Sequence, residues 1–230
     1  MKENNLILSA DDFGISQKAN NNILKLIELK KLGRVSIMTE GLINPEEINK
    51  LLASNVNLDV HLNLKKIDLN TTRETKDGVF SRSLRFLFLY LNGTLGAASA
   101  EVSWEGQIKK FETLFGKKPD GLNSHQHIHF FPAYLKVLLR LCKKHKIDYL
   151  RFGKCCLRKN TNLICFILNT LRLKNLKTFS QSEIATSDLL ISLDWIKNIE
   201  KFSNNLPEKT TELVCHPERD TEFEIIKKYF

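Results

Sequence analysis

Short apolar runs alternate with amphipathic helical patterns along this chain, and most of the runs end in polar residues. The first run predicts a buried strand at 5–10, followed by a helix that Ser16 caps and that extends to about Lys31. The same alternation predicts further strands at 34–39, 57–64, 121–126, 148–152, 177–180 and 211–216. Further helices are predicted at 45–54, 82–92, 98–116 and 132–145. Strands that alternate with helices favour an α/β fold with a mostly parallel sheet.

The chain contains no internal repeat, low-complexity segment or convincing linker, and a single domain is therefore predicted over residues 1–230. Its apolar content of 42% is ordinary for a soluble globular protein, and its length is sufficient to bury a large core. No apolar run approaches the ~18 residues that span a bilayer. The N-terminus lacks the apolar segment and cleavage site of a signal peptide, so a cytoplasmic location is expected.

An excess of basic residues, 35 Lys plus Arg against 26 Asp plus Glu, gives a net charge of +9. This charge favours anionic partners such as nucleic acid, a membrane surface or a phosphorylated substrate. Without an arginine-rich run or an aromatic-basic repeat, a lysine-rich soluble surface is the favoured interpretation, and no nucleic-acid partner is expected. The five cysteines include the adjacent Cys155 and Cys156 and form no CxxC pair, which argues against a disulfide framework and for a reducing compartment.

Polar clusters stand at the ends of four predicted strands. Asp11 and Asp12 end the first strand, and His61 lies near the end of the third. The segment SHQHIH at 124–129 ends a later strand, and His216 ends the last one. Because the carboxyl ends of parallel strands open on one face, these side chains are expected to lie together. Five of the six histidines occupy these positions, which makes this edge of the sheet the predicted site.

Each cluster also has a purely structural interpretation when it is taken alone. Asp11 and Asp12 are able to cap the turn before the next helix, and a lone His61 is more often a core histidine than a ligand. His216, which precedes a proline, is typical of a turn that ends a strand. At a period of two, the three histidines of 125–129 share one face of an extended chain, where a metal or polar cleft suits them better than a core. Together the clusters favour a site.

One carboxylate and two imidazoles, with coordination positions left open, are typical of a catalytic metal site. The open positions hold water, whose pKa falls towards ~7 in favourable zinc sites. A second carboxylate nearby, not bound to the metal, is then able to take the proton from that water. Two adjacent aspartates at a strand end therefore have two unequal roles available, one on the cation and one as the base.

These residues, in this order, resemble the YdjC-like carbohydrate deacetylase family, which includes chito-oligosaccharide deacetylases and the hopanoid-associated deacetylase. The matching segments are ADDFGIS with Asn20 six residues after Gly14, GRVSIMT, VHLNL, GQIKKFETLFGKKPDGLNSHQHIHFFP, YLRFG and TELVCHP. The pair ADDFG and SHQHIH is the specific part of the match. The resemblance implies a distorted (β/α) barrel related to polysaccharide deacetylases. It also implies a hydrolase that removes an N-acetyl group from an amino sugar or oligosaccharide.

Carried over position by position, the resemblance implies that Asp12, His61 and His125 hold one divalent metal ion. It implies that Asp11 is the general base and that His216 is the general acid for the leaving amine. The substrate-binding residues that the resemblance suggests are His127, Asn20 and Arg151. Histidine-rich ligation favours zinc, with magnesium, nickel and iron as the alternatives.

The sequence departs from the family pattern in three places. Asn123 stands where the family commonly has Asp, which is expected to weaken the orientation of a metal ligand. Glu218 replaces a usual Gly after His216, so a different local turn is expected. The chain ends 14 residues after His216, so the last helix and part of the barrel wall are expected to be missing or supplied by a partner subunit in a homodimer.

Other functions use the same residues or the same charge. Another metal-dependent hydrolase, such as a phosphoesterase, is one alternative, and a catalytically inactive sugar-binding or nucleic-acid-binding relative is the other. The apolar segments at 81–91 and 162–179 also carry Arg and Lys. Such segments are usually core-facing helices with solvated edges, and this interpretation is favoured. The alternative is docking at an anionic surface at the inner face of the membrane, to reach a lipid-linked sugar.

Overall fold

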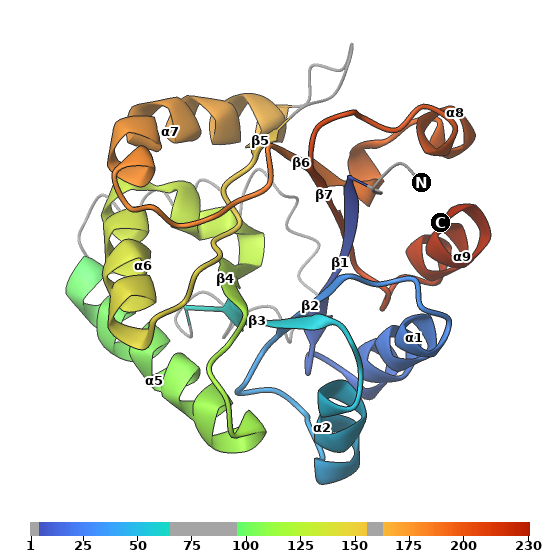
Figure 1. Ribbon diagram of the computed structural model, residues 1–230, viewed down its shortest axis with the longest axis horizontal. Coiled ribbons are helices and arrows are strands. Elements are labelled where there is room, and N and C mark those ends of the chain that lie inside the picture. The colour runs from blue at the N-terminus through green and yellow to red at the C-terminus, as the bar shows by residue number, and fades with distance from the viewer. Residues whose placement is uncertain (1–4, 65–95, 156–162) are drawn as a thin grey trace, which may run out of the picture.

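The computed structural model describes residues 5–64, 96–155 and 163–230, which form a curled sheet with helices around its outside (Figure 1). Within these residues the sheet has seven strands, paired in parallel in the order β4-β3-β2-β1-β7-β6-β5. In chain order the strands are β1 (Leu6–Phe13), β2 (Arg34–Ile37), β3 (Asn57–Leu62), β4 (Gly121–Ser124), β5 (Lys154–Cys155), β6 (Leu189–Ser192) and β7 (Thr211–Cys215). The parallel pairing and the curl confirm the predicted α/β fold of distorted-barrel type.

The described helices lie between successive strands, except the last one, which follows β7. The described helices are α1 (Gln17–Glu28), α2 (Pro45–Leu52), α5 (Ala97–Phe115), α6 (Pro132–His145), α7 (Leu163–Ser180), α8 (Ile199–Ser203), α9 (Asp220–Tyr229) and the 3-10 helices η1 (His125–Phe130) and η2 (Leu193–Trp195). Side chains cap the first turns of α1, α2 and α8. Ser16 caps α1, as predicted, by accepting a hydrogen bond from Ala19 N at 3.1 Å. Asn44 and Glu47 form a capping box at the start of α2. None of the described helices is both long enough and apolar enough to cross a bilayer.

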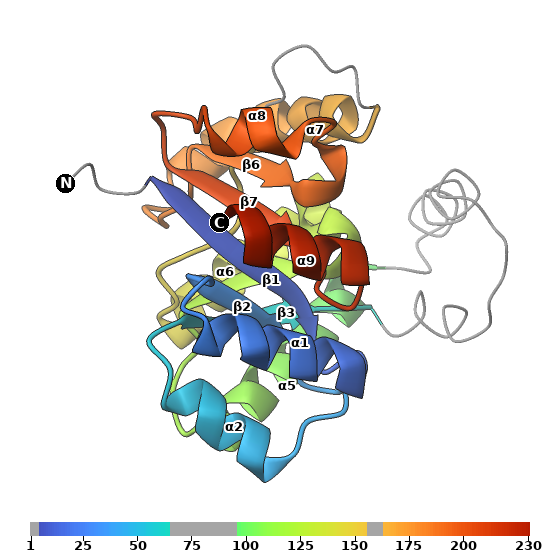
Figure 2. The same cartoon turned by 90° about the vertical axis from the view of Figure 1, so that its right-hand side faces the viewer.

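The core lies between the sheet and the helices that surround it. On α5, Trp104, Ile108 and Phe111 repeat at helical spacing, and all three side chains are fully buried against the sheet and α6. Figure 2 shows α1 and α9 side by side on the outside of β1. The last strand is therefore followed by a helix of this chain, α9, and the supply of a further part of the barrel wall by a partner subunit stays a prediction.

A short extended segment, 148–152, joins the two edges of the sheet. Leu122 N at the β4 edge donates to Tyr149 O at 3.0 Å, and Leu150 N donates to Ala185 O at 3.0 Å. The chain then continues into β5, which pairs with β6 at the other edge. The segment was predicted as a strand, and it forms isolated bridges that close the curled sheet.

The structure differs from the sequence prediction in two further places. Residues 177–180 were predicted as a strand, but they are the last turn of α7, where Phe179 continues the buried stripe of Cys165 and Leu168. The strand β6 was not predicted, because its short apolar run resembles a helix segment when periodicity is the only signal. The predicted helix at 82–92 lies outside the described residues.

The histidine-rich segment after β4 is not extended, which corrects the prediction that its histidines share one face. It forms η1, and Gln126 and His127 have positive φ angles of 56° and 55°. This turn is held by Ser124, whose Oγ accepts from His129 N at 3.1 Å. The three imidazoles therefore point to different surroundings.

Candidate metal centre

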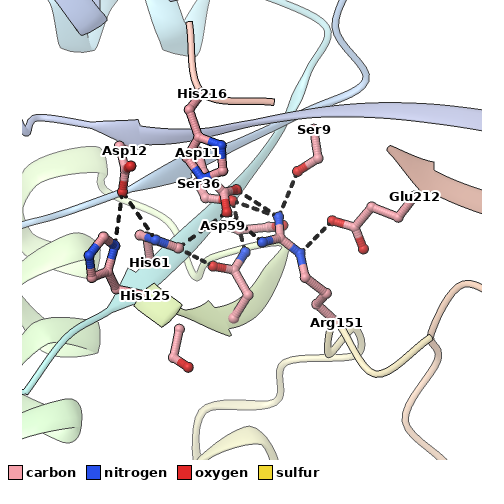
Figure 3. A network of polar contacts seen from close by, with 12 residues as sticks. Ser9, Asp11, Asp12, Ser36, Asp59, His61, His125, Arg151, Glu212 and His216 are labelled. Carbon is pink, nitrogen blue, oxygen red and sulfur yellow. Dashed lines mark hydrogen bonds and ion pairs between the residues drawn. The ribbon is translucent and has the colours of Figure 1, made fainter. Parts of the chain in front are cut away.

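The adjacent carboxylates at the end of β1 have different partners. The register of β1 against β2 shifts between Ala10 and Phe13, and Asp12 has a φ of 69° within this irregularity. A bulge of this kind changes the direction of successive side chains. Asp11 points to the interior of the barrel and Asp12 to the histidines of β3 and η1 (Figure 3). Both carboxylates are buried, at 2% and 6% exposure.

Asp12, His61 and His125 present three converging donor atoms. Asp12 Oδ1 lies 3.2 Å from His61 Nε2 and 3.2 Å from His125 Nδ1, and the donor atoms of the set all lie within 4.8 Å of one another. Burial raises the pKa of Asp12, but the hydrogen bonds from His125 and His61 outweigh it and hold this pKa well below its ordinary value. An ionised carboxylate beside two imidazoles is a donor set that fits a divalent cation such as Zn²⁺.

The ring of His61 is oriented by a neighbouring amide side chain. Its Nδ1 donates to Asn123 Oδ1, and Asn123 Nδ2 donates in turn to Ser36 Oγ at 2.8 Å. Because the amide nitrogen is bound to Ser36, its oxygen faces Nδ1 of the imidazole, which orients the ring with Nε2 towards Asp12. Asn123 thus orients His61, although the presence of Asn in place of the family's Asp was expected to weaken this orientation.

Asp11 is held by Arg151 rather than by the metal-site histidines. Arg151 Nη1 donates to Asp11 Oδ2 at 2.6 Å, and its Nη2 donates to Oδ1 at 2.8 Å. On the other side, Arg151 Nε donates to Glu212 Oε1 at 2.8 Å. Burial raises the pKa of Asp11, but the charge of Arg151 outweighs it and keeps this pKa below its ordinary value. Asp11 is therefore an ionised, oriented carboxylate, with its Oδ2 3.9 Å from His61 Nδ1.

His216 follows β7 at the same edge of the sheet and lies beside Glu222 of α9. Glu222 Oε2 accepts from His216 N at 2.7 Å and lies 3.7 Å from its Nδ1. Burial lowers the pKa of His216, but Glu222 outweighs burial and raises it, with a further contribution from Asp11 and Asp12. The residue Glu218 departs from the family pattern and accepts from the α1 cap, Ser16 Oγ, at 2.8 Å.

The structure places the predicted substrate-binding residues in different settings. Arg151 is fully buried with Asp11, and Asn20 is fully buried with its side chain on backbone groups. Asn20 Oδ1 accepts from Gly14 N at 2.6 Å, and its Nδ2 donates to Leu42 O at 2.7 Å, so it shapes the loop after β1. These contacts support positioning roles for both residues, and direct contact with substrate stays a prediction.

The two remaining histidines of η1 differ from His125. His127 lies 6.4 Å from the ring of Trp195, and burial lowers its pKa well below the ordinary value, so it is neutral. Among the described residues, its buried Nδ1 has no hydrogen-bond partner. His129 is a core histidine whose ring bonds Ser124 Oγ and Arg151 O, both at 2.7 Å, and burial lowers its pKa to about 3.

Three residues of this site were not predicted from the sequence. Glu212 lies inside the predicted last strand, where an acidic residue facing the barrel interior was a usable signal. Glu222 follows His216 by six positions and gave no signal of its own. Trp195 follows β6, a strand that was not predicted, so its place at the edge of the sheet went unrecognised.

The sequence profile described as YdjC-like protein matches residues 5–228. The chain belongs to the YdjC-like family. A chitooligosaccharide deacetylase of Salmonella paratyphi C is 27% identical to this YdjC-like chain over 219 residues, which are 92% of this chain and 81% of that protein. A carbohydrate deacetylase of Xenopus laevis is 24% identical over 153 residues, 64% of this chain and 50% of that protein. The match therefore spans about half of the length of the Xenopus laevis protein.

A solved structure shares the fold of this YdjC-like chain. It is the crystal structure of a proposed cellobiose-phosphate cleavage protein from Enterococcus faecalis V583, with a TM-score of 0.61 and 18% sequence identity. The superposition covers 97% of this chain and 85% of that chain. The likeness shows that the two chains share this curled parallel fold.

Proposed function

We propose that this YdjC-like chain is a metal-dependent hydrolase that removes an N-acetyl group from an amino sugar or an oligosaccharide. The observation that carries the proposal is the convergence of Asp12, His61 and His125 beside a separate ionised carboxylate, Asp11. The names of the relatives, carbohydrate deacetylase and chitooligosaccharide deacetylase, support the class of substrate. Amino-sugar amides are neutral and resistant to hydrolysis, so they need both an activated water and an acid for the amine.

In this proposal Asp12, His61 and His125 hold one divalent ion, for which zinc is the favoured identity. The chemistry that such an ion supplies when bound is polarisation of the acyl carbonyl and a lowered pKa for a nearby water, towards ~7. The division between the two aspartates follows from their contacts. Asp12 faces the two imidazoles, whereas both oxygens of Asp11 are held by Arg151.

The chain's own residues move the protons in two steps. Asp11 accepts the proton of the attacking water, because it is ionised and Arg151 fixes both of its oxygens. His216 donates a proton to the departing amine nitrogen, because Glu222 raises its pKa and keeps it protonated at higher pH. The products are acetate and a free amino sugar, and Arg151 stays bound to Asp11 throughout.

The division of labour is tested with Asp11→Asn and His61→Ala. Asp11→Asn should abolish acetate release from N-acetylated chito-oligosaccharides while the purified protein keeps its metal. His61→Ala should lose the metal, because a ligand is removed. Metal content is measured by mass spectrometry and acetate by an enzymatic assay. The matched controls are Asp148→Asn, an exposed carboxylate, and His145→Ala on α6, both outside the site.

Two results would contradict the proposal. Equal loss of metal in Asp11→Asn and His61→Ala would remove the distinction between base and ligand. Release of phosphate from sugar phosphates, without acetate from any amino sugar, would instead favour the phosphoesterase alternative. Binding of oligosaccharide without release of either product would favour the inactive sugar-binding relative.

A further inference from the structure

Helix α7 carries apolar side chains on its outer face as well as on its inner one. Its inner face packs Cys165, Leu168 and Phe179 into the core. The α7 outer face consists of Phe166, Ile167, Leu173, Lys174 and Lys177. Phe166 and Leu173 are 70% and 68% exposed, although both are large and apolar. A helix that is apolar on all sides is normally buried or placed against lipid.

The neighbouring helix α6 shows what an ordinary surface helix of this protein looks like. Its exposed positions include Lys136, Arg140, Lys143 and Lys144, and none of its large apolar side chains is exposed. Arg140 and Lys144 are paired with carboxylates of α5 at 2.6 Å and 2.9 Å. Helix α6 therefore lacks the apolar outer face that α7 carries.

The positive charge of α7 indicates which kind of partner its apolar outer face binds. Residues 163–182 contain three basic residues and no acidic one. No described carboxylate forms an ion pair with Lys174 or Lys177, which stand on the same face as Phe166 and Leu173. In a twofold symmetric dimer formed through this face, the lysines of the two copies would share one interface, and like charges there disfavour association. An anionic lipid surface satisfies both the lysines and the apolar side chains.

We infer that the α7 outer face docks this protein on an anionic membrane surface. Phe166, Ile167 and Leu173 enter the boundary between headgroups and acyl chains, and Lys174 and Lys177 contact the lipid charges. Because α7 follows β5 in a parallel sheet, it begins at the edge of the sheet where the candidate site lies. Docking brings that edge near lipid-carried amino sugars, and this last consequence alone rests on the proposed deacetylase function.

The test is sedimentation of the full chain with lipid vesicles. The wild-type protein should bind vesicles of phosphatidylcholine with phosphatidylglycerol, bind phosphatidylcholine vesicles weakly, and dissociate as salt rises. The variant Phe166→Glu/Leu173→Glu should lose binding. The variant Lys174→Gln/Lys177→Gln should bind about 25-fold more weakly, since each lysine near an anionic surface contributes about fivefold.

Matched controls separate the α7 outer face from general surface properties. Leu29→Glu/Leu52→Glu replaces two exposed apolar side chains elsewhere, at 47% and 44% exposure, and should bind as the wild type does. Lys136→Gln/Lys143→Gln on α6 should lose much less affinity than the α7 lysine variant. Circular dichroism and thermal melting confirm that each variant is folded.

The inference is wrong if the wild-type protein binds neither kind of vesicle, or if Phe166→Glu/Leu173→Glu binds as well as the wild type. Dimerisation that this variant abolishes, without vesicle binding, would assign the face to a second copy and also overturn the inference. Activity on a soluble chito-oligosaccharide should be unchanged in Phe166→Glu/Leu173→Glu. Vesicle binding by a protein that hydrolyses no amino sugar would refute the proposed function and leave the docking intact.

Discussion

Asp11 and Asp12 are adjacent in the sequence but lie in two different chemical environments. A residue with the φ of Asp12, 69°, lies in the left-handed region, which Asp tolerates better than most side chains. This conformation turns Asp12 towards the imidazoles while Asp11 stays in the barrel interior with Arg151. The unequal roles that the sequence predicted for the doublet therefore correspond to unequal contacts.

Asn123 is predicted to support metal binding through His61. Asn123→Ala removes the acceptor for His61 Nδ1 and should weaken Zn²⁺ binding about 10–100-fold, because the ring loses its orientation. Asn123→Asp keeps an acceptor at the same place and should retain or increase affinity. Competition with a fluorescent chelator measures both values. Unchanged affinity in Asn123→Ala would show that the contact has no part in metal binding.

Glu222 is predicted to set the alkaline limit of activity. The carboxylate raises the pKa of His216, so Glu222→Gln should lower that pKa. Because a general acid is lost as pH rises through its pKa, the alkaline limb of the kcat/KM profile should move to lower pH, with the acid limb unchanged. Glu224→Gln, an exposed change on the same helix, should leave the profile as it is. An alkaline limb that does not move in Glu222→Gln would remove His216 from the role of acid.

At the scale of elements, the loops after β1 and β2 hold the metal-site aspartate in place by direct backbone contact. Leu42 N donates to Gly14 O at 2.7 Å, and Gly14 has a φ of 100° that other residues rarely adopt. A Cβ at Gly41 would lie 2.1 Å from Gly14 O. Asn20 of α1 ties the two loops together from the other side. The position of Asp12 thus depends on how two loops and a helix pack.

Gly41→Ala is predicted to disturb the metal centre from outside it. The added methyl group forces the two loops apart, so thermal stability should fall and Zn²⁺ affinity should fall with it. Gly106→Ala in α5 is the control, because an added Cβ there meets nothing within 4 Å. Replacing a helical Gly by Ala should stabilise the protein by up to ~1 kcal/mol and leave metal affinity unchanged. Melting curves and chelator competition report both effects, and a Gly41→Ala protein with normal affinity would contradict the packing argument.

At the scale of the whole molecule, buried charges connect the site to the closure of the barrel. Arg151 comes from the segment that links the sheet edges and contacts Asp11 of β1 and Glu212 of β7. Arg34 of β2 pairs with Asp59 of β3 and lies over the ring of Tyr149, with 3.8 Å between its guanidinium carbon and the ring centroid. The polar interior therefore joins the central strands to the closing segment.

Arg151→Met is predicted to destabilise the fold as well as the site. It leaves the carboxylates of Asp11 and Glu212 buried without their partner, which should cost about 3–5 kcal/mol of unfolding free energy. Arg140→Met removes an exposed pair with Glu101 and should cost about 1 kcal/mol or less. Urea unfolding measures both. Similar losses in the two variants would show that the interior network contributes no more than a surface ion pair.

The sequence by itself determined the type of most described elements and the edge on which the site lies. Helices and strands follow from the local spacing of apolar residues and from capping residues, for example Ser16 before α1 and the apolar stripe of α5. The carboxyl ends of the strands in a parallel sheet lie at one edge. Asp11, Asp12, His61 and His216 could therefore be grouped before any coordinates. The local pattern failed at 177–180, where a strand-like run is held in a helix by the packing of α7.

Only the tertiary structure decided which buried groups meet. Asp11 and Arg151 are 140 positions apart, and Asn123 and His61 are 62 positions apart, so no local pattern specifies these contacts. The same holds for η1, where one turn sends His125 to Asp12 and His129 into the core. It also holds for α7, where the sequence does not specify which apolar side chains are buried in the core and which are exposed. Pairing of charges, burial and exposure depend on contacts between distant segments, and these exist only in the folded chain.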